Sequence, residues 1–441
     1  MAGLLWLLVA CGASDDPRPA VDDDAPNVVT ADIQAGIEAH IEEQCRIGDG
    51  FLRLAHGDGE LRLRLVRVHT EYLATLGPRR HFACVDMVDV GGDFYDVDFF
   101  LSGEPNSMTV TETTVHKLNG QPYYAWEQKP DKSWQRVPVE NAADHLLGVR
   151  TGKDAFRFQY TAKLPEITGA ARVWIPLPSS DGFQTIEVLS IDLPTDHRVL
   201  EDRAYGNRVL YFEAGPDSSH RELEVRFDVR REEKAAFVEP DVDLERFLKP
   251  ERLVPPGEMF QVAAAAAVAG KTGEVERARA LYDHVIDRMR YAKTGVGWGQ
   301  GDAVYACDAG SGNCTDFHAY FIALARSVGI PARFGIGASI PSERDEGGIG
   351  GYHCWAEFHA DGRWWPVDIS EADKCSNLAG YYFGHQPANR IELSRGRDLV
   401  VEPGPASGPI NFLAYPILEI DGKPTKMAKV AFLFERTATD S

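Results

Sequence analysis

A cysteine, a histidine and an aspartate in the last third of this chain have the types and spacing that thiol-based acyl transfer requires. Cys314 follows the glycine-rich stretch 295–313 and precedes apolar residues spaced as one face of a helix. We therefore predict that Cys314 begins a helix, where the helix dipole and backbone N–H groups favour a thiolate over a thiol. The same N–H groups can stabilise an oxyanion, which makes Cys314 a candidate nucleophile.

A short hairpin is expected to bring a base and its orienting acceptor together. Residues 352–358 and 364–368 have the pattern of two strands, and Asp361-Gly362 between them is a two-residue turn signal. With this turn, Asp368 is a diagonal neighbour of His353 on the same face, within reach of its ring. A three-residue turn would put Asp368 on the other face. The register thus predicts His353 as the base and Asp368 as its orienter.

Several motifs in this region together resemble the transglutaminase-like superfamily. They are Gly312-Asn313-Cys314-Thr315-Asp316-Phe317, residues 325–333, His353 shortly before Trp355, and Trp365-Pro366-Val367-Asp368. The resemblance covers roughly residues 274–370. It implies a papain-like α+β core with Cys314 as nucleophile, His353 as base and Asp368 as orienter. It does not fix the second oxyanion donor, for which Trp298, Gln300 and Asn313 are candidates.

The expected activity is cleavage or exchange of peptide or protein amide bonds through a Cys314 thioester, without a cofactor or metal. One alternative is a plain cysteine peptidase or amidase of the cell envelope, and another is a non-catalytic binding module on the same fold. A zinc site from Cys314, His353, Cys354 and Cys375 is disfavoured, because strand alternation places His353 and Cys354 on opposite faces. We expect Trp298, Trp355, Trp364 and Trp365 to be divided between the core and the cleft wall.

The N-terminus resembles a bacterial lipoprotein signal. A short apolar segment ends in Leu8-Val9-Ala10-Cys11, and residues 12–27, which contain five aspartates and three prolines, suit a solvated tether. This pattern predicts lipid attachment at Cys11 and a membrane anchor at the bacterial cell envelope, on the outer membrane or its periplasmic face.

Composition excludes one class of partner and indicates several domains. The 441 residues carry 67 acidic and 46 basic side chains, a formal net charge of -21, and no basic run interleaved with aromatics. Nucleic acid is therefore not an expected partner. With 44% hydrophobic residues, a chain of this length can bury two or three separate cores.

The predicted fold class is α+β, a papain-like transglutaminase core preceded by an α+β N-terminal domain and an all-β sandwich-like domain. Helical spacing at Ile33, Ile37 and Ile41 opens the first domain, and strict alternation from Phe156 to Tyr160 indicates strands in the second. The expected divisions are 1–28 for signal and tether, 29–150 for the N-terminal domain, 151–232 for the sandwich, 233–257 for a linker, 258–395 for the catalytic domain and 396–441 for a C-terminal β extension.

The remaining cysteines and histidines carry weaker predictions. In an oxidising compartment we expect Cys45 to pair with Cys84, and Cys354, turned away from the active-site face, to pair with Cys307 or Cys375. No metal-type spacing links the histidines of the first domain, so we expect them to be structural or solvent-facing. They are His69, His81 and His116.

Overall fold

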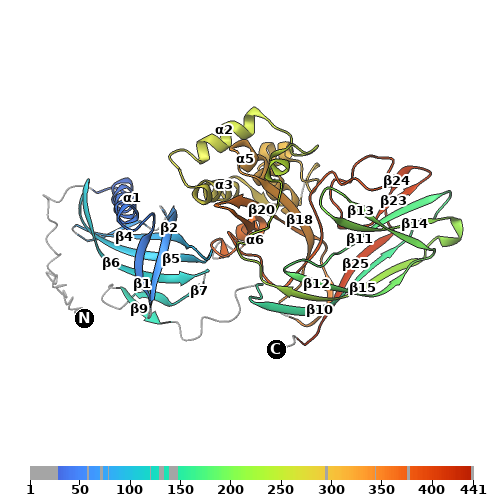
Figure 1. Ribbon diagram of the computed structural model, residues 1–441, viewed down its shortest axis with the longest axis horizontal. Coiled ribbons are helices and arrows are strands. Elements are labelled where there is room, and N and C mark those ends of the chain that lie inside the picture. The colour runs from blue at the N-terminus through green and yellow to red at the C-terminus, as the bar shows by residue number, and fades with distance from the viewer. Residues whose placement is uncertain are drawn as a thin grey trace, which may run out of the picture.

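The computed structural model describes residues 28–56, 59–69, 73–77, 79–119, 121–128, 134–138, 148–293, 296–342, 344–374 and 378–438 (Figure 1). The predicted lipid attachment site, Cys11, lies outside these residues, and so does Cys375. Within the described part of the chain, no helix combines the length and the apolar character needed to cross a membrane.

The N-terminal region packs one helix on a seven-stranded antiparallel sheet. Helix α1 (Thr30–Ile47) buries Ile33, Ile37 and Ile41 against one face of the sheet, as their spacing predicts. The sheet has the order β1-β2-β4-β5-β6-β7, with β3 also paired to β4. Its strands are β1 (Leu52–His56), β2 (Gly59–Val68), β3 (Ala74–Gly77), β4 (Arg80–Asp89), β5 (Phe94–Glu104), β6 (Ser107–Leu118) and β7 (Gln121–Pro122).

β6 and β7 pair antiparallel, with Leu118 opposite Gln121. Asn119, which directly follows β6, has a φ of 50°, as the Asn-Gly hairpin signal in the sequence predicts for this residue. Gly120 lies outside the described residues. The following strands β8 (Tyr124–Gln128) and β9 (Trp134–Pro138) form a separate two-stranded sheet.

The middle of the chain forms a β-sandwich that the C-terminus completes. The predicted alternation is confirmed in β10 and β15, whose apolar residues fill the space between two five-stranded sheets. The first sheet is β12 (Gln184–Asp192), β15 (Glu222–Glu232), β10 (Lys153–Lys163), β25 (Lys429–Arg436) and β19 (Glu346–Ile349). The second is β13 (His197–Asp202), β14 (Asn207–Ala214), β11 (Ala171–Leu177), β23 (Ile417–Ile420) and β24 (Lys423–Thr425).

The strands of the C-terminal segment 396–441 are integral to this sandwich. β25 pairs with β10, and β23 pairs with β11. Figure 1 shows these red strands lying among the green ones. The predicted catalytic domain also contributes a strand to the sandwich, because β19 pairs with β25.

The proline-rich segment 233–257 packs onto the predicted catalytic domain. Lys234 is buried, and its Nζ lies 2.8 Å from Glu357 Oε1. Arg333 Nε contacts the other oxygen of Glu357 at 2.7 Å. Two cations thus compensate one buried carboxylate, and this network joins the segment to strands β18 (Ala332–Ser339) and β20 (His353–Ala360).

The predicted catalytic domain packs helices on a four-stranded antiparallel sheet of order β21-β20-β18-β22. The apolar faces of α3 and α5, both predicted from helical spacing, are buried in this core. Its helices are α2 (Glu258–Ala267), α3 (Glu274–Arg288), α4 (Ala303–Ala309), α5 (Cys314–Ser327) and α6 (Ile369–Lys374). Its strands are β18 (Ala332–Ser339), β20 (His353–Ala360), β21 (Arg363–Val367) and β22 (Arg390–Arg395), and a short parallel pair, β16 (Arg290–Tyr291) and β17 (Ser311–Gly312), precedes α5.

The predicted Cys45–Cys84 disulfide is wrong. Both cysteines are free, and so are Cys307 and Cys354, which excludes a bridge between those two as well. Cys84 lies on the sheet face away from α1, whereas Cys45 lies on α1 and contacts the core between helix and sheet. The thiols therefore lie on different sides of the sheet. The option of pairing Cys354 with Cys375 falls outside the described residues.

Candidate active site

Cys314 is the first residue of α5, as predicted, and the residues around it build a complete helix N-terminus. The Asn313 side chain accepts a hydrogen bond from the Thr315 N–H at 2.9 Å, and Asp316 accepts one from the Asn313 N–H at 2.9 Å. This reciprocal arrangement is a capping box. It fixes the backbone on both sides of Cys314 and aligns the N–H groups of the first turn.

The glycine-rich loop is held against the same helix end by Asp316. Its carboxylate also accepts hydrogen bonds from the Gly299 N–H at 2.7 Å and the Gly301 N–H at 3.0 Å. A Cβ at Gly312 would lie only 2.4 Å from Asp316 Oδ2, so that position requires glycine. One buried carboxylate thus positions the loop and the nucleophile together.

The hairpin has the predicted register and brings His353 to Asp368. Ala360 pairs with Arg363 across the Asp361-Gly362 turn. His353 Nε2 donates a hydrogen bond of 2.6 Å to Asp368 Oδ2. The other carboxylate oxygen, Oδ1, accepts bonds from the Ser370 hydroxyl and the Glu371 N–H at the start of α6. Asp368 therefore orients the imidazole and caps a helix at the same time.

The three predicted site residues form a charge-separated group. The pKa of Cys314 is held well below its usual range by a hydrogen bond from the Cys354 thiol, with the hydrogen bond and charge of His353 adding to this effect against the cost of burial. Burial opposes protonation of His353, but the charge of Asp368 outweighs it and raises the pKa to about 10. Near neutral pH the structure thus favours a Cys314 thiolate facing a His353 imidazolium.

Cys354 does not turn away from the active site, so that prediction is wrong. Its sulfur lies 3.7 Å from His318 Nδ1 and close enough to Cys314 to lower the pKa of that thiol. Strand alternation failed as a guide here because His353 is the first residue of β20, at the end of the strand where α5 begins. Burial and the Cys314 charge raise the pKa of Cys354 well above its usual range. Cys354 therefore stays a thiol that donates to the neighbouring thiolate.

A second histidine, His318, lies one helical turn after the nucleophile and is buried. The Ile369 N–H donates to its Nε2 at 3.0 Å, so its Nδ1 carries the proton and donates to the Cys314 carbonyl oxygen at 2.7 Å. Burial lowers the pKa of His318, in agreement with a neutral ring. His318 thus ties the start of α5 to the start of α6, and the signal for it was its spacing of four residues from Cys314.

One of the three candidates for the second oxyanion donor, Asn313, already has a hydrogen-bond partner. The Asn313 amide nitrogen donates to the Tyr352 hydroxyl at 3.0 Å, so this candidate is already engaged. Burial, together with the nearby Cys314 charge, raises the pKa of the Tyr352 phenol well above its usual range, so it keeps its proton. Tyr352 was not predicted, although it directly precedes His353.

Three of the four tryptophans that we expected to be divided between core and cleft wall are core residues. Trp355, Trp364 and Trp365 are all buried at 2% exposure or less. Trp364 stacks against the Arg333 guanidinium, 4.0 Å from its ring centroid, in the network that holds segment 233–257. Trp298 is half-buried in the glycine-rich loop.

Two further charged residues surround the histidine–aspartate pair and were missed by sequence reasoning. Arg390, fully buried on β22, has a nitrogen 3.6 Å from Asp368 Oδ2. Glu371 Oε1 lies 3.9 Å from His353 Nδ1. Arg390 favours the carboxylate form of Asp368, and Glu371 favours the imidazolium form of His353. Neither lies in a motif that would have identified it.

Part of this chain is similar in sequence to known proteins. Residues 262–369 match the sequence model of the Transglutaminase-like superfamily. An uncharacterized protein of Haemophilus influenzae is 28% identical over 338 residues, which cover 65% of this chain and 89% of that protein. This part of the chain, from α2 to the start of α6, is therefore a transglutaminase-like domain.

Two solved structures are also similar. The structure of a candidate cysteine protease from Cytophaga hutchinsonii has a TM-score of 0.47 and 16% identity, covering 66% of this chain and 93% of its own. The periplasmic domain of TgpA from Pseudomonas aeruginosa has a TM-score of 0.27 and 15% identity, covering 53% of this chain and 93% of its own.

Proposed function

We propose that this protein is a cysteine-dependent acyl-transfer enzyme that hydrolyses amide bonds of peptides or proteins. The observation that carries the proposal is the buried group of Cys314, His353 and Asp368, in which the sulfur is poised as a thiolate and the imidazole as its conjugate acid. A thiolate at a helix N-terminus with a protonated histidine is the arrangement that amide cleavage through a thioester needs.

The reaction follows from these positions. The Cys314 thiolate attacks the amide carbon, and the carbonyl oxygen becomes an oxyanion facing the N–H groups at the start of α5. His353 gives its proton to the leaving amine, and the C–N bond breaks to leave a thioester on Cys314. Neutral His353 then takes a proton from water, whose oxygen attacks the thioester. The thiolate leaves, and His353 is protonated again.

We favour hydrolysis over transfer to an amine. Three of the four tryptophans that could have walled a dry cleft, Trp355, Trp364 and Trp365, are buried in the core. Transfer requires that water be excluded while an amine is positioned. Side-chain amides and backbone amides both fit the chemistry, so the proposed substrate class is a peptide or protein amide.

The test compares product partitioning in matched variants. Wild-type protein is incubated with a peptide amide library, with and without a high concentration of a primary amine, beside Cys314→Ala and the control Cys45→Ser. We expect free acid from wild type and from Cys45→Ser that the amine does not divert, and none from Cys314→Ala. An amine adduct as the main product would support transfer instead. Failure of all peptides while Cys314 stays reduced and reacts with a thiol reagent would favour a binding module.

We also propose that the enzyme works at the bacterial cell envelope, attached through lipid on Cys11. The support is the lipobox-like sequence Leu8-Val9-Ala10-Cys11 and the acidic tether after it. Mass spectrometry of the protein from its native membrane should find Cys11, acylated, as the mature N-terminus. Recovery of an unmodified segment from Met1 onward would refute the anchor.

A further inference from the structure

The N-terminal sheet carries a cluster of buried polar side chains on the face away from α1. Cys84 pairs with Asp98, and Asp86 pairs with Asp96, across the antiparallel strands β4 and β5. The residues that alternate with them are apolar and buried against α1. A thiol and three carboxylates therefore share the other face, and all four are at most 7% exposed.

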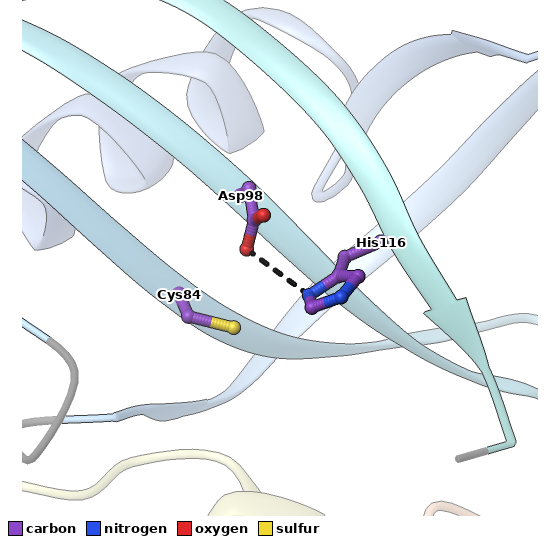
Figure 2. Close-up of side chains that lie close together, drawn as sticks. All are labelled: Cys84, Asp98 and His116. Atoms are coloured by element: carbon purple, nitrogen blue, oxygen red, sulfur yellow. Dashed lines mark ion pairs between the residues drawn. The ribbon is translucent and has the colours of Figure 1, made fainter. Parts of the chain in front are cut away.

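A β-bulge adds a histidine to this cluster. The register of β5 and β6 shifts next to Asp96, which leaves His116 as the extra residue of β6. His116 Nδ1 lies 3.6 Å from Asp98 Oδ1, and the next residue, Lys117, places its Nζ 2.6 Å from Asp96 Oδ2. His116 and Lys117 are consecutive, yet both contact carboxylates on the same face of the sheet. In a regular strand, consecutive side chains point to opposite faces. Figure 2 shows Cys84, Asp98 and His116 from three neighbouring strands converging on one point.

These three residues have the geometry of a metal-binding group. One ligand atom from each of Cys84, Asp98 and His116 lies within 4.8 Å of the other two. Metal–ligand distances of about 2.0–2.3 Å put tetrahedral ligand atoms about 3.3–3.8 Å apart, so a small inward movement suffices to close the site. Asp98 is fully buried, whereas the His116 side chain is 16% exposed. An ion can therefore reach the group from the solvent past His116.

We propose that Cys84, Asp98 and His116 bind a zinc ion. A thiolate sulfur and an imidazole nitrogen select a borderline-soft cation, whereas magnesium and calcium prefer oxygen ligands only. Three protein ligands leave the fourth tetrahedral position to a water molecule. Because the ligands come from β4, β5 and β6, the ion links the three central strands of the sheet.

Tyr124 supplies the outer support that metal ligands usually have. Its hydroxyl donates a 2.8 Å hydrogen bond to Asp98 Oδ2, which leaves Oδ1 directed toward His116. Its ring also stacks on the His116 imidazole, with centroids 4.6 Å apart and an interplanar angle of 16°. One buried side chain therefore orients two of the three ligands.

A divalent cation would bind Cys84 as the thiolate and release its proton. No metal-type spacing marks these three residues in the sequence, because they lie on different strands and a bulge is needed to bring His116 to the other two.

The experiment uses the full chain in a Cys314→Ala background, so that the catalytic thiol cannot contribute. The protein is stripped with a chelator and titrated with cobalt(II) or zinc(II). We expect one equivalent to bind, with a thiolate-to-cobalt charge-transfer absorption that zinc displaces. Cys84→Ser should lose this absorption, while the matched control Cys45→Ser should keep it. Tyr124→Phe should keep the absorption and weaken binding by about 10- to 100-fold.

His116→Gln provides a second variant, because its partly exposed side chain can be replaced with little risk to the fold. It should also lose the absorption while its circular dichroism stays that of the parent. The proposal is overturned if the parent chain binds no cobalt, or if Cys84→Ser or His116→Gln binds it with unchanged affinity and spectrum. Failure of amide hydrolysis leaves this test unaffected, since its readout is metal binding in a chain without the catalytic cysteine.

Discussion

The hairpin of the catalytic core and the central strands of the N-terminal sheet both gather polar side chains across antiparallel pairs, yet only the first could be derived from sequence. The hairpin β20–β21 spans 15 residues, and its turn fixes the register that places Asp368 beside His353. In the N-terminal sheet, His116 reaches Asp98 and Cys84 only because β6 contains an extra residue.

The difference shows that a constraint set by a local turn can be recognised in the sequence, whereas one set by the packing of a whole sheet cannot. A two-residue turn is a strong short-range signal that sets every pair after it. A bulge leaves no comparable signal, and its position depends on how two long strands are packed. A cluster that needs a bulge therefore escapes motif-based reasoning even when its residues are visible in the sequence.

The largest effect should come from breaking the register of the catalytic hairpin. Inserting one glycine between Asp361 and Gly362 makes a three-residue turn, which moves Asp368 to the wrong face. The histidine then loses its orienter, and we expect kcat/KM for amide hydrolysis to fall by about 10⁴-fold. Steady-state kinetics on a peptide amide measures the loss.

The chain contains a matched control for this insertion. Asp421-Gly422 joins β23 to β24 with the same turn, since Asp421 and Gly422 have φ angles of 50° and 72°, against 50° and 76° at Asp361 and Gly362. The same insertion there should leave kcat/KM within about twofold, because that hairpin lies in the sandwich and no site residue belongs to it. Near-normal activity in the first variant would show that the register does not position Asp368.

The site could be predicted from sequence where short-range rules applied and not where they ended. The start of α5 followed from helical spacing after a glycine-rich loop, and the pairing of Ala360 with Arg363 followed from the turn. The orientation of Cys354 was wrong because alternation says nothing of what approaches the end of a strand. The Cys45–Cys84 bridge was wrong because sequence does not reveal on which side of a sheet each thiol lies.

The next effect tests whether the two regions depend on one another for stability. Arg279 on α3 is 1% exposed, and its guanidinium contacts Asp86 at 2.7 Å and Asp283 at 3.0 Å. Arg279→Met would leave Asp86 buried in the polar cluster without its main cation. We expect the free energy of unfolding to fall by about 3–5 kcal/mol, measured by urea denaturation.

A double variant isolates this interaction. Adding Asp86→Asn to Arg279→Met removes the uncompensated charge, so the pair should be less destabilised than the two single effects added together. If Arg279→Met lowers the free energy of unfolding by less than about 1 kcal/mol, the polar cluster of the N-terminal sheet and the catalytic core do not depend on one another for stability. The two regions would then be separate folding units.

A smaller effect is expected from Tyr352, which directly precedes His353 and was not predicted from the sequence. Tyr352 accepts a hydrogen bond from Asn313 and keeps a proton near the Cys314 sulfur. We infer from this position that the Tyr352 hydroxyl donates to the oxyanion. Because such a donor acts mainly in the transition state, Tyr352→Phe should lower kcat by about 10²-fold with little change in KM. Tyr415→Phe, which removes a hydroxyl 3.3 Å from the Tyr352 N–H, serves as a control with near-normal kcat. Equal losses in both variants would indicate a packing role.

The pH dependence of kcat/KM should depend on the interaction of His353 with Asp368. Asp368 raises the pKa of His353 to about 10 against the effect of burial, so the imidazolium is lost only above that value. We expect kcat/KM to fall roughly tenfold per pH unit on the alkaline side of pH 10. The same sign applies to stability, because a raised pKa gives stabilisation that is complete below the ordinary value of 6.5 and lost as the pH rises through about 10. In Asp368→Asn the alkaline limb should move to lower pH. An unmoved limb would assign it to another group.

The smallest effect should come from the ion pair that links the N-terminal sheet to the turn of the hairpin. Arg64 on β2 has a nitrogen 2.9 Å from Asp361 Oδ2, but the two side chains are 41% and 26% exposed. Water and salt screen such a pair, so Arg64→Met should cost only about 0–1 kcal/mol of unfolding free energy and leave kcat/KM unchanged. Because the turn already fixes the register through its own backbone geometry, it needs no external support. If Arg64→Met lowered activity as well as stability, the register would depend on the N-terminal sheet, and the catalytic hairpin would be as non-local as the cluster around His116.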